Sequence, residues 1–282
     1  MKKIDCKIIT EQVKKLCIEA NYYLPKDLEE RICNCIENEP YEIAKNTLKN
    51  IKENFEISKQ GVFPICQDTG MACIFLEVGQ DVHIINGNIE DAINEGVRQG
   101  YKEGYLRKSI VDDAVFERIN TKDNTPAVIN YEIVPGDKLK IVVAPKGFGS
   151  ENMSKIKMLK PSDGVEGIKK FVIDTVEKAG PNACPPLVIG VGIGGNFEKV
   201  ALLAKKAMMR TIGTKNEDER YAKLEDELLN EINKLGIGPA GYGGKTTALC
   251  LNIENYPTHI AGMPVAVSIC CHVARHKEVI LW

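Results

Sequence analysis

The segment "PICQDTG", residues 64–70, gathers several chemically active side chains in one short stretch. Cys66 offers a soft thiolate ligand for a metal. The amide of Gln67, the carboxylate of Asp68 and the hydroxyl of Thr69 follow it and can form hydrogen bonds with a polar ligand. A final glycine marks a turn. Taken alone, the segment fits either a structural thiol beside a turn or one corner of a metal site.

Two further cysteine positions lie at junctions between expected elements. Cys184 lies in the irregular segment "GPNACPP", and the pair Cys270 and Cys271 ends an expected strand just before "HVARH". Neighbouring residues of a strand point to opposite faces, so at most one of this pair should face a shared site. Three thiolates from distant loops can bind zinc or an iron–sulfur cluster. The spacing alone nevertheless favours scattered, half-buried thiols.

The remaining cysteines are expected to be structural. The chain has ten cysteines and no evident secretory signal, so a disulfide framework is not expected. Thiols inside amphipathic helices or apolar strands usually behave as small buried hydrophobic groups. This group comprises Cys6, Cys17, Cys33, Cys35, Cys73 and Cys250.

Histidine and glycine supply the other candidates. His259 in "YPTHIAG" can exchange protons near neutral pH, and together with Asp68 it would form an acid–base pair, whereas His83 is expected at the surface. The glycine-rich segment "GVGIGGNF" lies between an expected strand and an expected helix. It is only a weak dinucleotide-binding signal, because no acidic residue ends a strand at the required distance. A tight strand-to-helix turn is the preferred interpretation.

Hydrophobic periodicity predicts helices and strands with no internal repeat. We expect a mixed α/β (α+β) fold, with an N-terminal helical segment followed by a β-sheet core with flanking helices. Asn196 is placed to cap one helix, and Gly180 to end another. Expected helices cover residues 8–55 (three helices), 88–106, 162–180, 196–212 and 216–236, and expected strands cover 71–79, 127–134, 138–146, 185–195, 246–254, 258–262 and 264–270.

Composition argues against several classes of protein. The 282 residues are 44% hydrophobic and 27% charged, which is typical of a globular chain. A net charge of -2 gives no reason to expect nucleic acid or an anionic membrane as a partner. The apolar stretches are too short to span a membrane. Lys14 and Lys15 interrupt the N-terminal segment, so no signal peptide is expected and we predict a cytoplasmic protein.

Taken together, these segments resemble the α-type subunit of the iron–sulfur hydro-lyases, which are class I fumarate hydratase and L-tartrate dehydratase. The resemblance spans roughly residues 60–276 and is far more specific than any single glycine loop. The matching segments are "PICQDTGMACIFLEVG", "YLRKSIVDD", "NTPAVINYEIVPGD", "PKGFGSENMSKIKMLKPSDG", "ACPPLVIGVGIGGNFEKVALLAKKA" and "GIGPAGYGGKTTALCLNIENYPTHIAGMPVAVSICCHVARH".

The resemblance implies a [4Fe–4S] cluster held by Cys66, Cys184 and Cys271. The register against the following "ARH" favours Cys271 over Cys270 as the third ligand. Three thiolate ligands leave one iron open, and an open iron can act as a Lewis acid on a 2-hydroxy acid. The "GVGIGG" segment would then provide backbone geometry beside the cluster.

The resemblance also assigns residues to the substrate. A dianionic substrate needs cations or N–H donors, and the planar fork of an arginine suits a carboxylate. Dehydration further needs a group that removes a proton from the carbon next to the leaving hydroxyl. The implied set is Gln67, Arg107, Gly147 and Gly149 for substrate binding, and Asp68 and His259 for acid–base catalysis.

The same resemblance implies one catalytic domain over residues 1–282, with a helical subdomain over 1–60 and cluster and substrate binding over 61–282. Single-chain family members carry a second domain that supplies further arginines, a lysine and a hydroxyl residue, whereas this sequence ends at Trp282. We therefore expect a separately encoded β subunit. The expected assembly is α2β2, or an α homodimer when the chain is isolated.

Three functions follow from the resemblance. The first is reversible hydration of fumarate to (S)-malate, a reaction of the tricarboxylic acid cycle, by the α subunit of a two-subunit enzyme. The second keeps the chemistry and converts L-tartrate to oxaloacetate. The third is a non-catalytic iron–sulfur sensor, and the intact "QDTG", "YLRKS" and "YPTH" segments argue against it.

Overall fold

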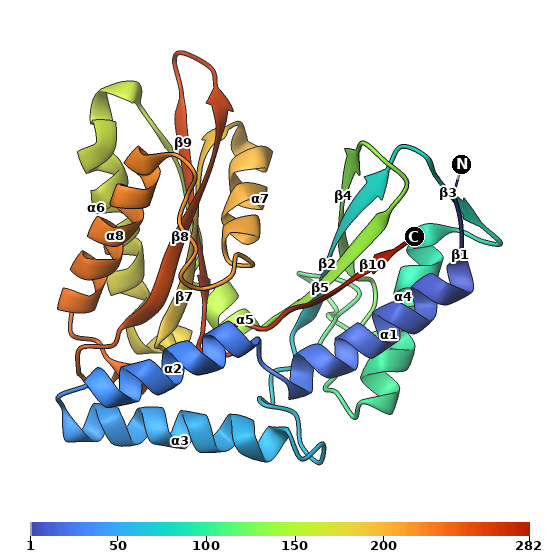
Figure 1. Cartoon of the computed structure of the whole chain (residues 1–282), viewed down its shortest axis with the longest axis horizontal. Helices are drawn as coiled ribbons and strands as arrows, with labels where there is room; N and C mark the ends of the chain where they lie inside the picture. The colour runs from blue at the N-terminus through green and yellow to red at the C-terminus, as the bar shows by residue number, and fades with distance from the viewer. Residues whose placement is uncertain (1) are drawn as a thin grey trace. The chain divides into compact units, whose positions relative to one another are not determined.

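The computed structural model describes residues 2–282, which form two compact units (Figure 1). Unit 1 contains the chain up to Pro25, Asn54–Phe148 and Arg275–Trp282, and unit 2 contains Lys26–Glu53 and Gly149–Ala274. Helices and sheets occur in both units, which confirms the predicted mixed fold class. Neither unit coincides with residues 1–60, so the predicted helical subdomain and single catalytic domain stay predictions.

The elements alternate between helix and strand along most of the chain. Those of unit 1 are β1 (Lys2–Asp5), α1 (Cys6–Tyr22), β2 (Met71–Gly79), β3 (Val82–Ile85), α4 (Ile89–Glu103), β4 (Val128–Val134), β5 (Leu139–Lys146) and β10 (Lys277–Leu281). Those with all or most of their residues in unit 2 are α2 (Lys26–Asn38), α3 (Glu42–Ser58), α5 (Phe148–Glu151), β6 (Lys155–Leu159), α6 (Gly164–Ala179), β7 (Leu187–Gly195), α7 (Phe197–Ala207), α8 (Glu219–Lys234), β8 (Ala248–Thr258) and β9 (Met263–Cys270).

Unit 1 is built on a four-stranded sheet in the order β10-β5-β2-β4. Strand β2 pairs in parallel with β4 and antiparallel with β5. The alternate residues Ala72, Ile74 and Leu76 of β2 join one hydrophobic core with residues of α1 and α4. Gly96 of α4 lets the two helices approach closely, because a Cβ there would lie 2.7 Å from the Thr10 carbonyl oxygen.

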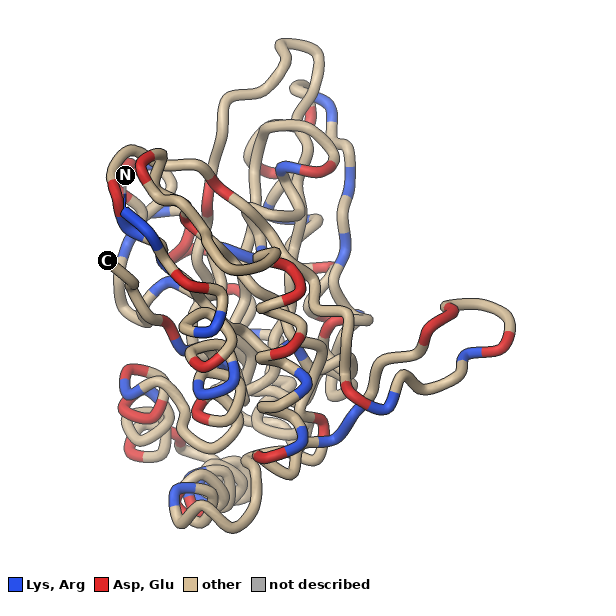
Figure 2. The backbone as a smooth tube through the Cα atoms, turned by 90° about the vertical axis from the view of Figure 1, so that its right-hand side faces the viewer, with Lys and Arg blue, Asp and Glu red and all other residues tan. Residues whose placement is uncertain are grey.

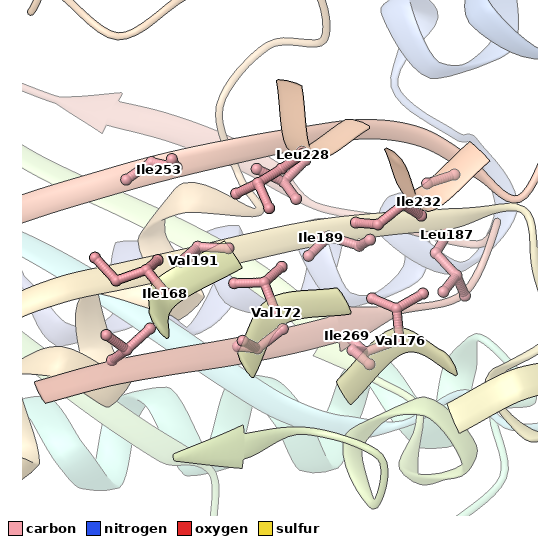
Figure 3. Packing of buried hydrophobic residues seen from close by; sticks show 14 of the residues in the cluster. Ile168, Val172, Val176, Leu187, Ile189, Val191, Leu228, Ile232, Ile253 and Ile269 are labelled. Atoms are coloured by element: carbon pink, nitrogen blue, oxygen red, sulfur yellow. The ribbon is translucent and has the colours of Figure 1, made fainter. Parts of the chain in front are cut away.

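Unit 2 contains a second four-stranded sheet, in the order β6-β9-β7-β8, with helices on both faces (Figure 1). Helices α6 and α8 cover one face, where Ile189 and Val191 of β7 pack with Val172 and Leu228 (Figure 3). Helix α7 covers the other face, where its residues pack with Ala266 of β9. The polypeptide enters α7 through Asn196, whose side chain accepts a hydrogen bond from the Lys199 N–H as predicted.

Glycines on β7 make room for α7. A Cβ on Gly190 would lie 2.1 Å from the Ala204 carbonyl oxygen, and one on Gly192 would lie 2.1 Å from that of Val200. The odd-numbered residues of the strand face α6 and α8, so its glycines stand on the alternate face. The "GVGIGG" segment therefore serves helix packing, while its expected place beside the cluster stays a prediction.

Most expected elements are present, with three differences. Residues 258–262 do not form the predicted strand, because the Gly262 N–H donates to the His259 carbonyl oxygen and closes a turn between β8 and β9. Strands β1, β6 and β10 and the short helix α5 were not expected. Strands β4 and β5 follow each other through the predicted turn, but they do not pair, since β2 lies between them.

The distribution of charged residues and the hydrophobicity of the helices agree with the mixed composition of the sequence. Figure 2 shows Lys and Arg residues interspersed with Asp and Glu residues along most of the chain. Within residues 2–282, no helix combines the length and the hydrophobicity needed to cross a lipid bilayer.

We predict that Gly192→Ala lowers the free energy of unfolding by about 2 kcal/mol or more, because its methyl group meets the backbone of α7. Urea unfolding followed by circular dichroism measures this change. Gly262→Ala is the matched control in the same unit, since its Cβ would have no neighbour within 3.8 Å. The control should change stability by less than about 0.5 kcal/mol. Equal effects of both substitutions would contradict the packing role of Gly192.

Candidate functional site

The polar turn at residues 67–70 lies in unit 1, directly before β2. The Asp68 carboxylate accepts hydrogen bonds from two backbone N–H groups: Oδ1 from Gly70 at 3.0 Å and Oδ2 from Phe148 at 2.9 Å. A Cβ on Gly147 would lie 3.1 Å from Oδ2, so this position favours glycine. The structure thus brings together Asp68 and Gly147, two of the predicted site residues. The carboxylate is held in one orientation by the backbone around it.

Arg107 is joined to the same turn. The Thr69 hydroxyl donates a hydrogen bond of 3.0 Å to the Arg107 carbonyl oxygen. The Arg107 side chain is exposed, and within residues 2–282 it forms no hydrogen bond or ion pair. Gln67 is exposed as well, and Cys66 is half-buried. Unit 1 therefore has an accessible thiol, amide and guanidinium on residues that lie at the turn of the fixed carboxylate or are hydrogen-bonded to it.

Three buried side chains support this turn from the core side, and sequence reasoning assigned none of them. The Tyr101 hydroxyl lies 2.8 Å from the Thr69 carbonyl oxygen and 3.0 Å from that of Gly70. The Asn124 amide donates to the Gly70 carbonyl at 3.2 Å. Arg275 donates through Nη2 to the Asp68 carbonyl oxygen. We call Tyr101, Asn124 and Arg275 the buried polar cluster.

The buried polar cluster satisfies backbone groups that burial would otherwise leave unpaired. Burial raises the pKa of Tyr101 well above its usual value, so its hydroxyl remains a hydrogen-bond donor at any physiological pH. The Asn124 Oδ1 accepts from the Ser109 N–H at 2.8 Å, which connects the segment after Arg107 to the same support. In the sequence, Tyr101 resembles an ordinary core residue of a helix and cannot be recognised as a support of the turn. Asn124 and Arg275 lie in the segments "NTP" and "HVARH", which matched the family but were given no such role.

In unit 2, the structure places Cys184 and Cys271 close together. The His272 backbone N–H lies 3.4 Å from the Cys184 carbonyl oxygen, and the His272 Nδ1 lies 3.0 Å from the same oxygen. A carbonyl only accepts, so Nδ1 carries the proton in this contact. Cys184 itself is exposed and has a left-handed backbone, with φ of 54°. Such a conformation is uncommon outside glycine and often accompanies a functional position.

Burial distinguishes the two adjacent cysteines. Cys270 is 6% exposed, ends β9 and pairs with Val188 of β7. Cys271 follows the strand and is partly exposed. A metal ligand must be reachable by the metal, so this difference supports Cys271 over Cys270, although the ligand itself stays a prediction.

The remaining predicted residues lie in two places in unit 2. A Cβ on Gly149 would have the Asn182 carbonyl oxygen at 3.9 Å, which puts Gly149 near the Cys184 loop. His259 is exposed in the β8–β9 turn, where its Nδ1 accepts from the Ala261 N–H at 3.2 Å. The eight residues of β9 separate this turn from Cys271, a span of roughly 23 Å at about 3.3 Å per residue. Within unit 2, His259 and Cys271 are not brought together.

The predicted ligand cysteines have properties that fit an iron–sulfur cofactor. Cys184 and Cys271 are accessible neighbours in unit 2, and Cys66 in unit 1 lies two residues before the carbonyl that Arg275 contacts. The Arg275 Nε and Nη1 are buried without an acceptor, and an anionic group would supply one. Across residues 2–282, no three or more His, Cys, Asp or Glu side chains form a group that could hold a metal ion. The three-cysteine ligand set therefore stays a prediction.

Other cysteines are poor candidates for ligands. Burial raises the pKa of Cys17 and of Cys250 to about 12. A thiolate, not a thiol, binds a metal or attacks an alkylating reagent. Both residues are also part of the packed interior, as predicted.

These differences predict a strong order of thiol reactivity in the metal-free chain. At pH 8, iodoacetamide should modify Cys184 first, whereas Cys17 and Cys250 have a thiolate fraction of roughly one in ten thousand. Peptide mapping by mass spectrometry measures each rate, and the urea-unfolded chain, in which all thiols are exposed, is the control. Modification of Cys17 at the rate of Cys184 would contradict the described burial.

Comparisons with known proteins find relatives that match nearly the whole chain. The model of the family described as fumarate hydratase (Fumerase) matches residues 10–280. A putative L(+)-tartrate dehydratase subunit alpha of Methanocaldococcus jannaschii is 43% identical over 271 residues, which cover 95% of each chain. The L(+)-tartrate dehydratase subunit alpha of Escherichia coli O157:H7 is 30% identical over 277 residues, covering 97% of this chain and 90% of the relative.

The family match covers nearly the whole sequence, and it includes both the polar turn of unit 1 and the paired cysteine loops of unit 2. The relatives likewise align over both units. The chain is therefore a hydro-lyase and belongs to the fumarate hydratase (Fumerase) family.

Proposed function

We propose that this chain is the α subunit of a two-subunit iron–sulfur hydro-lyase that interconverts fumarate and (S)-malate. The observation that carries the proposal is the polar turn, where a partly exposed thiol precedes a carboxylate fixed by two backbone N–H groups. The unpaired guanidinium of Arg107 is attached to the same turn through the Thr69 hydroxyl. A thiol ligand, a fixed acid–base group and a cation for carboxylates are what dehydration of a hydroxy acid requires.

The proposed cofactor ligands are Cys66, Cys184 and Cys271. When bound, a [4Fe–4S] cluster with one open iron supplies Lewis-acid chemistry to the departing hydroxyl group. The chain's contribution is to present accessible thiols, and the two His272 contacts to the Cys184 carbonyl oxygen keep the unit 2 pair together.

The proposed substrate groups are Gln67, Arg107, Gly147 and Gly149. Arg107 would bind one carboxylate of the dianion with its exposed fork. Gln67 is exposed as well, and its side-chain amide can donate a hydrogen bond to the second carboxylate. Gly147 leaves room next to Asp68, because a larger residue would crowd its Oδ2 atom.

Asp68 is the proposed proton-transfer group of unit 1. Its two N–H partners orient both carboxylate oxygens and leave further lone pairs to accept a proton. His259 is the second proposed acid–base residue, and within unit 2 it lies far from Cys271.

Because β9 separates His259 from Cys271, a role at the same centre would require a His259 from another copy of the chain. This is in keeping with the proposed α2β2 or α homodimer assembly.

L(+)-Tartrate is the second candidate substrate. Two relatives that align over nearly the whole chain carry the name L(+)-tartrate dehydratase subunit alpha, at 43% and 30% identity. Tartrate and malate are both four-carbon 2-hydroxy dicarboxylates, so the same thiols, arginine and carboxylate would serve either substrate. The "subunit alpha" of these names also supports a separate β subunit as the partner. A cytoplasmic location remains a prediction.

We predict that the chain, reconstituted anaerobically with iron and sulfide, dehydrates (S)-malate only when its β subunit is present. The assay follows fumarate formation from malate and oxaloacetate formation from L-tartrate side by side, with the chain alone and with its partner. A kcat/KM ratio above about 10 in favour of malate, or about 1.4 kcal/mol, would support fumarate as substrate.

The controls separate the possible outcomes. A tenfold preference for tartrate would establish the second candidate in place of the first. Full turnover by the chain without a β subunit would contradict the two-subunit proposal. A metal-loaded complex that turns over neither substrate would contradict the hydro-lyase assignment for this pair of dicarboxylates.

A further inference from the structure

Arg275 is a buried cation without an anionic partner. Its side chain is 5% exposed, and its Nη2 donates to the Asp68 carbonyl oxygen. Its Nε and Nη1 are buried and have no hydrogen-bond partner. No carboxylate within residues 2–282 forms an ion pair with it. The Asp68 carboxylate accepts hydrogen bonds from the N–H groups of Gly70 and Phe148 instead.

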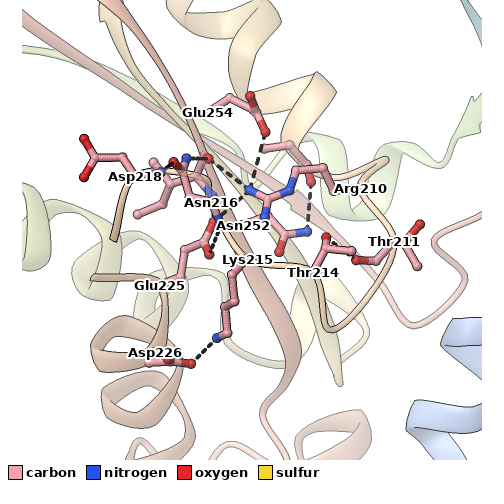
Figure 4. A network of polar contacts seen from close by, with 12 residues as sticks. Arg210, Thr211, Thr214, Lys215, Asn216, Asp218, Glu225, Asp226, Asn252 and Glu254 are labelled. Carbon is pink, nitrogen blue, oxygen red and sulfur yellow. Dashed lines mark hydrogen bonds and ion pairs between the residues drawn. The ribbon is translucent and has the colours of Figure 1, made fainter. Parts of the chain in front are cut away.

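Arg210 in unit 2 is a mostly buried arginine whose charge is balanced by carboxylates, and it serves as a comparison (Figure 4). Its Nη1 donates to the Glu225 carboxylate at 2.8 Å and to the Ile253 carbonyl at 3.1 Å, and Glu254 lies 3.4 Å away. Its Nη2 lacks a partner, but the adjacent carboxylates balance the charge. Arg275 is more deeply buried than Arg210, and its one acceptor is a neutral carbonyl.

An unpaired buried cation is strongly unfavourable, because the charge loses its hydration without gaining a counter-charge. A carbonyl acceptor alone does not explain an arginine at this position, since Asn124 satisfies the neighbouring Gly70 carbonyl with a neutral amide. The two unpartnered donors leave this place open to an anionic acceptor.

The position of these donors is limited by the shape of the side chain. The guanidinium is a small rigid plane, so Nε and Nη1 lie within the same group as the Nη2 that contacts Asp68. That contact is two residues from Cys66 in the sequence, and the charge of Arg275 acts on the buried Tyr101 hydroxyl beneath the turn. The donors thus lie beside the turn that carries the proposed thiol ligand and proton-transfer group.

We propose that Arg275 is a positioning residue that fixes the Asp68 carbonyl with Nη2 and offers Nε and Nη1 to an anionic group at the polar turn. The shared chemistry of that group is a negatively charged acceptor, which can be the thiolate and sulfide face of the cofactor or a substrate carboxylate. The identity of the anion rests on the proposed function. The inference that an anion binds here does not rest on the proposed function, because it follows from the unpaired charge of Arg275.

The first experiment uses the metal-free full-length chain and compares Arg275→Met with Arg210→Met. Methionine has a similar length and no charge, so it removes the unpaired cation at position 275 and a paired cation at position 210. We expect the urea midpoint of Arg275→Met to equal or exceed that of the unsubstituted chain. Arg210→Met should lower it, because the buried Glu225 carboxylate loses its counter-charge and keeps only the backbone N–H donors of Asn216 and Ile253. A loss in Arg275→Met as large as in Arg210→Met would identify Arg275 as a structural residue and overturn the proposal.

The second experiment uses the complex with the β subunit, reconstituted with iron and sulfide. Arg275→Met should release iron to a chelator about tenfold faster or more, or raise the KM for the dicarboxylate by a similar factor with a smaller change in kcat. Faster iron release and a shifted reduction potential without substrate would identify the cofactor as the anion, whereas a change in KM alone would identify the substrate. Arg275→Lys, which keeps the charge and loses the fork, should restore only part of either effect.

The outcomes separate this proposal from the function proposed above. If the unsubstituted complex binds no cluster, the function fails, and the Arg275 proposal is then decided by thermal stabilisation of the metal-free chain by malate. Loss of that stabilisation in Arg275→Met supports the proposal, and its persistence, or its absence from the unsubstituted chain, overturns it. Unchanged iron release and unchanged KM in a loaded complex also overturn it.

Discussion

The buried support of the polar turn is the interaction on which the site of unit 1 depends. The carbonyl oxygens of residues 68–70 point into the protein, where they meet the hydroxyl of Tyr101, the amide of Asn124 and the guanidinium of Arg275. These carbonyl groups are thus satisfied by buried side chains, while Gln67 of the same turn is exposed. The Asp68 carboxylate can then be oriented by two N–H groups rather than by a competing cation.

The fold supplies this support from separate parts of the sequence. Tyr101 lies near the end of α4, Asn124 lies in the loop before β4, and Arg275 lies just before β10. The turn itself leads into β2, the strand that pairs on one side with β4 and on the other with β5. Strand β5 ends at Lys146, so its next residues bring the Gly147 backbone and the Phe148 N–H to the Asp68 carboxylate. The sheet order therefore brings the backbone after β5 to the Asp68 carboxylate.

Part of this could be predicted from the sequence. Cys66, Gln67 and Asp68 are consecutive, so their types marked a candidate site, and the resemblance to the hydro-lyases favoured it over a structural thiol. The helix and strand periods located β2, α4 and β7. The support could not be predicted, because Tyr101 has the same helical spacing as the apolar core residues around it. The sheet order could not be predicted either. The short turn between β4 and β5 suggested that the two strands pair, but β2 lies between them.

His259 was expected to form an acid–base pair with Asp68 beside Cys66. The direction of β9 places His259 at the far end of that strand from Cys271. The glycine-rich segment was assigned to a strand-to-helix turn, but the close approach of α7 to Gly190 and Gly192 could not be predicted.

The central claim is that three separate thiols of this chain, Cys66, Cys184 and Cys271, hold one iron–sulfur cofactor. The most direct measurement is the iron and sulfide content of the complex after anaerobic reconstitution with the β subunit, for the serine variant of each residue and for Cys270→Ser. The account predicts that each of the three variants loses most of its bound iron. It also predicts that Cys270→Ser keeps iron, because that thiol is buried within β9. Retention of iron by Cys271→Ser together with its loss from Cys270→Ser, or retention by all four variants, would contradict the claim.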